Sequence, residues 1–431
     1  MAKQAKQWGA IIVMIALFAM IAFVTNLCTP MATIIKNQGE ISNVLAQIGN
    51  YGNFVAYLVM GIPAGMLISK FGYKKTALIG LLVGIVGILI QWCSGLIDAG
   101  DGSNIGTVFG VYLLGAFISG LTMCILNCVV NPMLNLLGGG GNKGNQLIQI
   151  GGVFNSTAAV CCYILMGALI ADATKAKISD ATPALMIALA IFVIAFVVIL
   201  FTKIEEPEQA PVELGLIKGA MSYRHFALGA LAIFLYMGIE VGVPNYVLQY
   251  LTATKEAGGF GISAGIAGLL VAVYWFMMLV GRFVGAAIGN KISSRTMVTT
   301  VSIATLCLVL FGMFAPADTL VNFPGVDWGK LELIWQEIPV GIFAFLLVGL
   351  CTSVMWGAIF NMAVEGLGKY TAIASGIFMT MVFGCAVMMA VQGAVADATN
   401  YITSFWVVVF CAAYILFYAL VGSRVSKRSE E

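Results

Sequence analysis

Three amide side chains recur at four-residue intervals in an otherwise apolar stretch of the sequence. Asn127, Asn131 and Asn135 share one face if residues 106–137 form a helix. An amide both donates and accepts hydrogen bonds, so this face could bind the hydroxyl groups of a neutral polar ligand. The same amides could instead join neighbouring helices, and Asn131, which precedes Pro132, could satisfy a kinked backbone. Both interpretations stay open from the residues alone.

One acid suggests a different chemistry. Glu240 lies in a long apolar stretch with no basic neighbour in the sequence. It lies about 24 Å along its helix from a start near Arg224, whereas Arg282 lies about 12 Å from the corresponding end of another helix. We therefore expect no direct ion pair between them. Glu240 could exchange a proton, contact the hydroxyl groups of a ligand, or have a structural role.

Further amides and aromatic rings extend the set of candidates. Amides bind hydroxyl groups, and the rings of Tyr236 and Trp275 could stack on a sugar, although most aromatic residues in such a chain pack against helices or mark interfaces. The ligand-binding candidates are Asn26, Asn53, Tyr57, Asn127, Asn131, Gln149, Asn155, Tyr236, Glu240, Trp275, Asn361 and Gln392.

The composition explains where these side chains must be positioned. Of 431 residues, 61% are hydrophobic and 9% are charged, which would leave a soluble domain with an apolar surface. A bilayer is therefore the expected solvent, and the length allows about twelve spanning helices. The ten cysteines all lie in apolar stretches, so we expect neither disulfides nor a metal site, and no basic stripe suggests nucleic acid.

Apolar stretches separated by turn and charge signals predict the fold class. We expect an all-α integral membrane protein with twelve transmembrane helices in two pseudo-symmetric six-helix halves, at residues 1–203 and 224–431. The acidic segment 204–223 is the expected cytoplasmic linker. The predicted spans are 9–30, 47–69, 76–97, 106–137, 147–171, 183–203, 224–251, 262–289, 296–316, 337–364, 370–396 and 401–422.

The basic residues predict the orientation. With both termini inside, fifteen of the 21 lysines and arginines fall on the cytoplasmic side and five fall outside, leaving Arg282 within a span. Charges near the cytoplasmic ends could form ion pairs that close a gate, or could serve only to orient the spans. His225 is expected to be a solvated linker residue. The gate candidates are Lys70, Lys74, Lys75, Arg282 and Glu365.

Several motifs follow one another in the order and spacing of a known family. The segment Gly65 to Lys75 is similar to the loop signature of the major facilitator superfamily, with Ser69 where an acid is expected. The whole chain resembles the fucose:proton symporter family, which includes fucose and glucose/galactose permeases. The motifs that carry this resemblance are Asn131-Pro132, Gly138 to Asn145, Phe154-Asn155, Tyr236 to Val241, Gly281 to Gly285 and Gly366 to Thr371.

The resemblance implies a sugar in a central cavity and proton coupling through acids in spans one and four. At the matching positions this chain has the amides Asn26 and Asn127, and Gly152 stands where a glutamine is expected in span five. The coupling ion therefore stays open between H+ and Na+, and a uniporter that acts by facilitated diffusion is an alternative.

Together, these features predict secondary transport of a neutral sugar, a hexose, deoxyhexose or N-acetylhexosamine, by alternating access. An anionic sugar would favour a central arginine, and export of amphipathic compounds would favour a cavity lined by Phe and Met. A membrane enzyme would need clustered His, Asp or Glu, which the spans lack. We expect a multi-pass protein of the bacterial cytoplasmic membrane, with no cofactor, that functions as a monomer with a small sugar and the lipid bilayer as its partners.

Overall fold

The structure is a computed structural model that describes most of the chain. The described backbone comprises residues 8–39, 43–97, 103–169, 182–204, 206, 215–255, 258–262, 264–316, 318–327 and 332–425. Within these ranges, side chains are described except at residues 26–39, 43–53, 163–169, 264–265, 326–327 and 332–334. Two binding candidates, Asn26 and Asn53, therefore lie outside the described side chains.

Long apolar helices dominate the described residues. Ten helical segments are long and apolar enough to cross a membrane, and the segment Thr182–Phe201 reaches a mean hydropathy of 3.3. One of them, α2 (Asn43–Leu96), contains both the second and the third predicted span, because only Gly72, with φ 82° and ψ 173°, interrupts it. A bilayer offers no hydrogen bonds to the backbone, so each apolar run must satisfy its own backbone groups as a helix. The predicted helical membrane architecture is confirmed.

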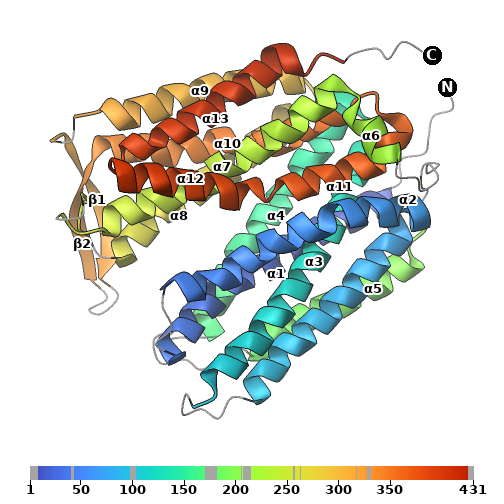
Figure 1. Ribbon diagram of the computed structural model, residues 1–431, viewed down its shortest axis with the longest axis horizontal. Helices are drawn as coiled ribbons and strands as arrows, with labels where there is room; N and C mark the ends of the chain where they lie inside the picture. The colour runs from blue at the N-terminus through green and yellow to red at the C-terminus, as the bar shows by residue number, and fades with distance from the viewer. Residues whose placement is uncertain are drawn as a thin grey trace. The chain divides into compact units, whose positions relative to one another are not determined.

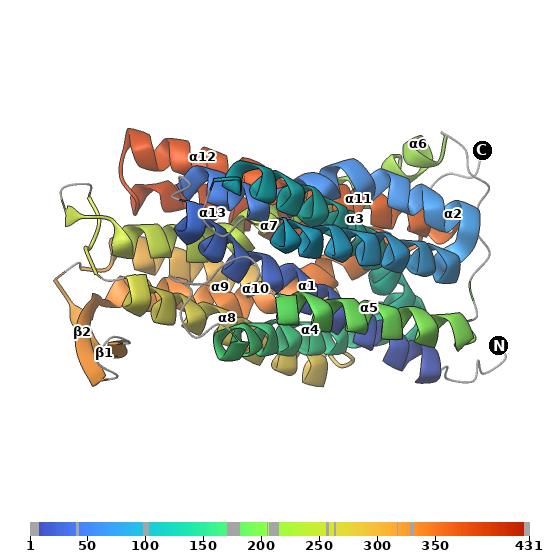
Figure 2. The ribbon, with the colours of Figure 1, turned by 90° about the horizontal axis from the view of Figure 1, so that it is seen from below.

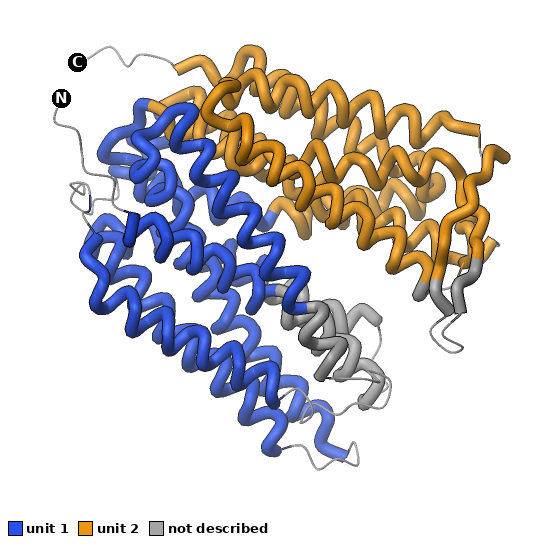
Figure 3. The backbone as a smooth tube through the Cα atoms, turned by 180° about the vertical axis from the view of Figure 1, so that it is seen from behind, with its two compact units in different colours: residues 1–222, 366–383 blue, residues 223–365, 384–431 orange. Residues whose placement is uncertain are grey.

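Unit 1 is one of two compact units and comprises residues Met1–Ser222 and Gly366–Phe383 (Figure 3). Within it, α2 packs along α3 and α5, and α1 packs along α4, as Figure 2 also shows. The glycines Gly61, Gly65 and Gly376 let α11 approach the backbone of α2 closely. The remaining elements of the unit are α1 (Trp8–Gly39), α3 (Ile105–Leu137), α4 (Gly141–Leu169), α5 (Thr182–Phe201), α6 (Gly215–Met221), the 3-10 turn Gly368–Tyr370 and α11 (Thr371–Met381).

Unit 2 comprises residues Tyr223–Glu365 and Gly384–Glu431. Its core is built on α10 (Val340–Val364), which packs against α7, α8 and α9 and is the most buried of the candidate spans. The other elements are α7 (Arg224–Thr252), α8 (Ala264–Ile288), α9 (Ser294–Phe314), β1 (Leu320–Asp327), β2 (Glu332–Pro339), α12 (Gly384–Ala398), the 3-10 turn Thr403–Phe405, α13 (Trp406–Phe417) and the π-helical turn Tyr418–Gly422.

The predicted eleventh span is divided between the units. Its helix is interrupted at Val382 and Phe383, so that α11 is grouped with unit 1 and α12 with unit 2. The predicted boundaries at residues 203 and 224 did not anticipate this division. The assignment of residues 224–431 to one six-helix half stays a prediction.

The connection between α9 and α10 contains an antiparallel hairpin that the sequence reasoning did not predict. Strands β1 and β2 pair from Leu320 with Pro339 to Asp327 with Glu332, and Figures 1 and 2 show them across one end of the unit 2 helices. Phe323 of β1 packs against Phe343 of α10, and Ile338 is fully buried. The predicted spans 296–316 and 337–364 leave this connection unassigned, because the apolar runs on either side of it are much stronger signals.

His225 is buried in unit 2 rather than solvated, so that expectation was wrong. Its Nε2 lies 2.8 Å from the backbone carbonyl oxygen of Glu365, where α10 ends. The last carbonyls of a helix have no partner within the helix, and an imidazole N–H is a suitable donor for them. His225 therefore fastens the start of α7 to the end of α10.

Candidate functional site

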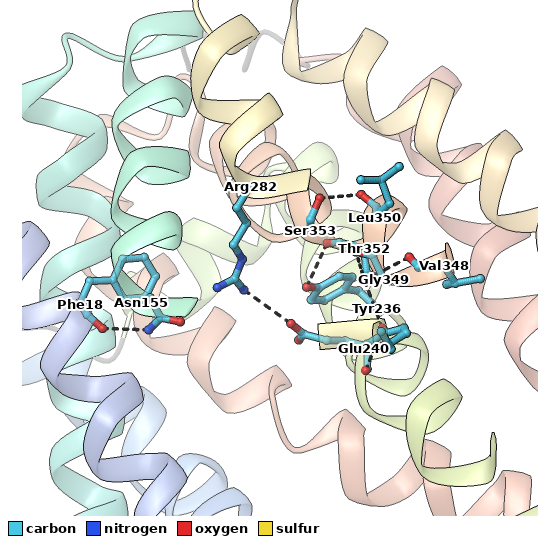
Figure 4. A network of polar contacts seen from close by, with 11 residues as sticks. Phe18, Asn155, Tyr236, Glu240, Arg282, Val348, Gly349, Leu350, Thr352 and Ser353 are labelled. Carbon is cyan, nitrogen blue, oxygen red and sulfur yellow. Dashed lines mark hydrogen bonds and ion pairs between the residues drawn. The ribbon is translucent and has the colours of Figure 1, made fainter. Parts of the chain in front are cut away.

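A charged pair connects α7 and α8 in unit 2. Nη2 of Arg282 is 3.8 Å from Oε1 of Glu240, and the two side chains are 14% and 15% exposed (Figure 4). A charge-assisted hydrogen bond typically spans 2.7–2.9 Å, so this pair is loose. Its partial exposure means that a small polar molecule can compete for either group.

The expectation that these two residues do not pair was wrong. Positions along two separate helices are comparable only if the ends of α7 and α8 lie at the same level. The arginine side chain is also long, and Figure 4 shows it extending from α8 towards the carboxylate of Glu240. The gating role suggested for Arg282 stays a prediction.

Three hydroxyl groups form hydrogen bonds between the helices next to Glu240. Oη of Tyr274 on α8 donates to the backbone carbonyl oxygen of Glu240 at 3.0 Å and lies 3.1 Å from Oγ1 of Thr352 on α10. Oη of Tyr236, one turn before Glu240, donates to the backbone carbonyl oxygen of Thr352 at 3.3 Å. Helices α7, α8 and α10 are therefore joined by hydrogen bonds at one level.

Tyr274 and Thr352 were absent from the predicted site. Both side chains are fully buried, and neither contributes a charge or an amide that would single it out in the sequence. One signal was present, because Pro244 lies four residues after Glu240 and cannot donate the hydrogen bond that the Glu240 carbonyl would receive in a regular helix.

Unit 1 contains a neutral polar cluster. Nδ2 of Asn127 on α3 donates to Oη of Tyr57 on α2 at 2.7 Å, and Nδ2 of Asn131 donates to the backbone carbonyl oxygen of Asn127 at 3.0 Å. All three side chains are buried. The structure thus brings three of the predicted binding residues together. The carbonyl that Pro132 leaves without a helical donor is that of Cys128, and Ser375 rather than Asn131 donates to it.

The two amides predicted on α4 have separate partners. Nε2 of Gln149 donates to Oδ1 of Asn145 on the same helix at 3.4 Å, and Gln149 is buried. Nδ2 of Asn155 donates to the backbone carbonyl oxygen of Phe18 on α1 at 2.8 Å, as Figure 4 shows. The Asn155 bond connects α4 with α1, whereas the Gln149 bond lies within α4.

The remaining candidates of unit 2 lie on α8, α10 and α12 and have partners of their own. Asn361 lies about 13 Å along α10 from Thr352 and donates to Oγ of Ser294 at 2.9 Å. Gln392 of α12 is buried and donates to Oγ of Ser404 at 3.4 Å. The ring of Trp275 packs edge-on against Tyr274 and is 43% exposed. Their roles in binding stay predictions.

The predicted gate lysines lie near the turn at Gly72, which forms hydrogen bonds with Glu206, an acid outside the predicted gate. Both carboxylate oxygens of Glu206 accept backbone N–H groups, from Tyr73 and Lys74, at 2.8 Å each. Nζ of Lys74 donates to the carbonyl oxygens of Leu200 and Thr202 at the end of α5. The linker acids and the Ser69 substitution in the loop signature were the signals that could have suggested this contact.

The other gate candidates have different surroundings. The ammonium group of Lys70 lies over the ring of Phe71, and the Lys75 side chain is exposed. Glu365 contributes its backbone carbonyl oxygen to His225. A gate formed by ion pairs among these residues stays a prediction.

The chemistry available to these clusters is hydrogen bonding and proton exchange. The unit 2 cluster combines a carboxylate and a guanidinium with three hydroxyl groups, and the unit 1 cluster combines amides with a phenol. Among the described spans, Glu240 is the one acid that lies more than two residues from a span end. Groups of His, Cys, Asp or Glu that could hold a metal ion do not occur among the described residues.

Sequence comparisons identify relatives over nearly the whole chain. A family model described as Major Facilitator Superfamily matches residues 10–388. The chain is similar to a glucose/galactose transporter of Brucella abortus biovar 1 (strain 9-941), with 29% identity over 415 residues, which cover 95% of this chain and 92% of the relative. It is also similar to an L-fucose-proton symporter of Escherichia coli (strain K12), with 22% identity over 456 residues, which cover 98% and 96%.

Comparison with solved structures agrees with this at the level of the fold. The outward conformation of the Major Facilitator Superfamily transporter FucP has a TM-score of 0.78 and 21% identity, covering 95% of this chain and 97% of that one. The proton:xylose symporter XylE has a TM-score of 0.69 and 13% identity, covering 96% and 94%.

Proposed function

We propose that this chain, which belongs to the Major Facilitator Superfamily, is a membrane transporter that imports a neutral hexose together with a proton. The observation that carries the proposal is the Glu240–Arg282 pair set among the hydroxyl groups of Tyr236, Tyr274 and Thr352. The names of the relatives, a glucose/galactose transporter and an L-fucose-proton symporter, support the substrate class and the coupling.

The charge balance of the two polar clusters favours a neutral solute. In unit 2 the carboxylate of Glu240 and the guanidinium of Arg282 oppose each other, and in unit 1 Asn127 and Tyr57 are uncharged. An anionic sugar would need a cation that is not already opposed by an acid. A hydroxyl-rich neutral ring instead suits amides and phenols, which donate and accept hydrogen bonds.

The ion pair provides a way to couple the sugar to a proton. A proton on Glu240 would leave the guanidinium of Arg282 without its carboxylate, which is costly in a partly buried position. Sugar hydroxyl oxygens could then accept the guanidinium N–H groups and offset that cost. Without a proton, the sugar must compete with the ion pair. Each ligand therefore favours the binding of the other, which is the definition of positive coupling between two sites.

Coupled import requires that the transporter reorients between outward-open and inward-open states mainly in two forms. These are the form that carries both sugar and proton and the form that carries neither. Protonated Glu240 with sugar, and ionised Glu240 paired with Arg282, are the two states in which both groups are satisfied. After the sugar leaves, the proton dissociates from Glu240, and the resulting carboxylate pairs again with Arg282. A sodium ion in place of the proton is the runner-up, because the carboxylate could bind either cation.

The same proposal includes location and assembly. We infer a bacterial cytoplasmic membrane with both termini in the cytoplasm, because fifteen of 21 basic residues then lie inside. A single chain carries both compact units, so we propose that one chain is sufficient for transport.

The test is uptake into proteoliposomes that hold the purified protein. A panel of glucose, galactose, fucose and N-acetylglucosamine is compared under a proton gradient, a sodium gradient and no gradient. We expect accumulation of at least one hexose that depends on the proton gradient. Accumulation driven by the sodium gradient would identify Na+ rather than H+ as the coupling ion. Equilibration without a gradient would indicate a uniporter, and no uptake of any sugar would overturn the substrate class.

A variant pair assigns the coupling step. Glu240→Gln is expected to lose proton-driven accumulation while still exchanging labelled for unlabelled sugar across the membrane, because an amide cannot cycle a proton. Glu337→Gln makes the same chemical change at an exposed carboxylate of β2 and should behave like the wild type. Accumulation that survives in Glu240→Gln would remove Glu240 from the coupling mechanism.

A further inference from the structure

Pro244 leaves one backbone carbonyl of α7 without its helical donor. In an α-helix the N–H of each residue bonds to the carbonyl four residues earlier, and proline has no N–H. The carbonyl four residues before Pro244 belongs to Glu240. Within a membrane-spanning helix, water cannot readily replace the missing donor, so another protein group must provide it.

Tyr274 provides that donor from a different helix. Its Oη lies 3.0 Å from the carbonyl oxygen of Glu240. Thr352 Oγ1 lies 3.1 Å from the same phenol oxygen and also contacts the carbonyl oxygen of Gly349 at 3.2 Å. The phenol of Tyr274 on α8 therefore lies between the Thr352 hydroxyl of α10 and the backbone carbonyl of Glu240 on α7.

The position of Tyr274 is itself fixed by close backbone packing. A Cβ atom added at Gly349 of α10 would overlap the carbonyl oxygen of Tyr274, so the two helices touch there through their main chains. The tyrosine ring is fully buried. The donor, Tyr274, therefore lies where α8 and α10 are closely packed. The acceptor, the Glu240 carbonyl, lies in the turn of α7 that lacks the Pro244 hydrogen bond.

We propose that Tyr274 is the positioning residue for Glu240, replacing the hydrogen bond removed by Pro244 and thereby aiming the carboxylate at Arg282. This inference rests on the proposed function, because it assigns the geometry of the coupling pair. Orientation at this point matters because the Arg282–Glu240 contact is loose, at 3.8 Å, and a small rotation of the Glu240 backbone would break it.

A double-mutant cycle between Tyr274 and Pro244 tests the proposal. Tyr274→Phe keeps the buried ring and removes only the donor, and we expect about a tenfold fall in Vmax/KM for proton-driven uptake, the size expected when a buried acceptor loses its partner. Pro244→Ala restores a backbone N–H that can reach the Glu240 carbonyl. In the Pro244→Ala background, adding Tyr274→Phe should change Vmax/KM by less than about twofold, since the carbonyl keeps a donor.

Tyr414 of α13, which donates to another backbone carbonyl of α7, is the matched control. Oη of Tyr414 donates to the carbonyl oxygen of Leu228 at 3.2 Å, but Ala232 already supplies the helical N–H to that carbonyl. Tyr414→Phe should therefore alter Vmax/KM by less than about twofold. Thr352→Val, which removes the hydroxyl beside the phenol but leaves the phenol in place, should cause an intermediate loss of about threefold.

Thermal unfolding of the same variants separates this inference from the proposed function. Tyr274→Phe should lower the melting temperature, and Pro244→Ala should abolish that effect of the phenylalanine, whether or not any sugar is transported. If the wild type moves no sugar but the melting cycle holds, the transport proposal fails and the hydrogen-bond replacement stands. Equal losses for Tyr274→Phe with and without Pro244, or a loss no larger than that of Tyr414→Phe, would overturn the inference.

Discussion

Each unit contains a proline-interrupted helix next to its polar cluster. In α3 of unit 1, Pro132 removes the donor for the Cys128 carbonyl, and Oγ of Ser375 on α11 donates to that oxygen at 3.1 Å. In α7 of unit 2, Pro244 has the same effect on Glu240, and Oη of Tyr274 donates at 3.0 Å. In both units the replacement donor is a side-chain hydroxyl from a neighbouring helix.

The chemistry beside the two prolines differs. Asn127, which precedes Cys128, forms a neutral pair with Tyr57, whereas Glu240 forms an ion pair with Arg282. A neutral pair responds little to protonation and suits the recognition of hydroxyl groups. An ion pair responds strongly, because removing one charge leaves the other uncompensated. A side-chain hydroxyl that replaces the backbone donor lost at a proline can therefore lie beside a recognition cluster in unit 1 and beside a coupling pair in unit 2.

The largest effect should come from removing one charge of the unit 2 pair. Arg282→Gln leaves the Glu240 carboxylate without its cation, and we expect a loss of about 3 kcal/mol in unfolding free energy. Unfolding of the purified protein in detergent would measure it. The double variant Arg282→Gln with Glu240→Gln should recover most of the loss, because no charge then remains buried. Equal destabilisation of the single and double variants would contradict an energetically coupled pair.

The second effect concerns the glycine contacts that hold the donor helices. Gly349→Ala forces a Cβ atom into the backbone of Tyr274 and should destabilise unit 2 by about 2–3 kcal/mol. Gly61→Ala, which meets the backbone of Thr380 beside Gly376, should have a similar effect in unit 1.

A glycine in open space is the control for both substitutions. Gly268 of α8 has no atom within 4 Å of a Cβ added there, so Gly268→Ala should raise stability by about 0.5–1 kcal/mol through its better helix propensity. Opposite signs for Gly349→Ala and Gly268→Ala in the same unfolding assay would support the contact argument. A destabilising Gly268→Ala would undermine it.

The third effect tests whether unit 1 uses its hydroxyl as unit 2 does. Ser375→Ala removes the donor to the Cys128 carbonyl and should cost about 1–2 kcal/mol in unfolding free energy. Adding Pro132→Ala should reduce that cost to a few tenths, since the backbone then supplies an N–H. Ser353→Ala is the comparison variant, because Ser353 donates to the Leu350 carbonyl, which already has Val354 as its helical donor.

The smallest effect distinguishes recognition from coupling. Tyr57→Phe removes the partner of the Asn127 amide and should raise the KM for sugar by about threefold, the size of one modest hydrogen bond. The ratio of inside to outside sugar at steady state should stay unchanged under a fixed proton gradient. A fall in that ratio would mean that the neutral cluster of unit 1 also takes part in coupling.

The helices and the polar candidates could be predicted because each depends on a local property. An apolar run such as residues 182–201 must become a helix in a bilayer wherever it lies, and a polar residue such as Glu240 is conspicuous in such a run. The hairpin between α9 and α10 was missed because its two eight-residue strands show no regular alternation of apolar and polar residues. Glu206 was missed because its partners, Tyr73 and Lys74, lie more than 130 residues away.

Pairing in the site could not be predicted for a related reason. Position along a helix gives depth relative to that helix's own end, and the offset between α7 and α8 depends on how α10 packs against both. That offset, together with the reach of the arginine side chain, brings Arg282 to Glu240. Tyr274 has no distinguishing feature in the sequence, and its role emerges only when its distance to the Glu240 carbonyl is known.

The apolar spans, the prolines Pro132 and Pro244 and the scarcity of charge within the membrane follow from residue types and their spacing alone. Which hydroxyl replaces each missing backbone donor, and which cation opposes Glu240, depends on how the helices pack. Hydrogen bonds and ion pairs act over a few ångströms, and such distances between separate helices are set by packing rather than by any single segment.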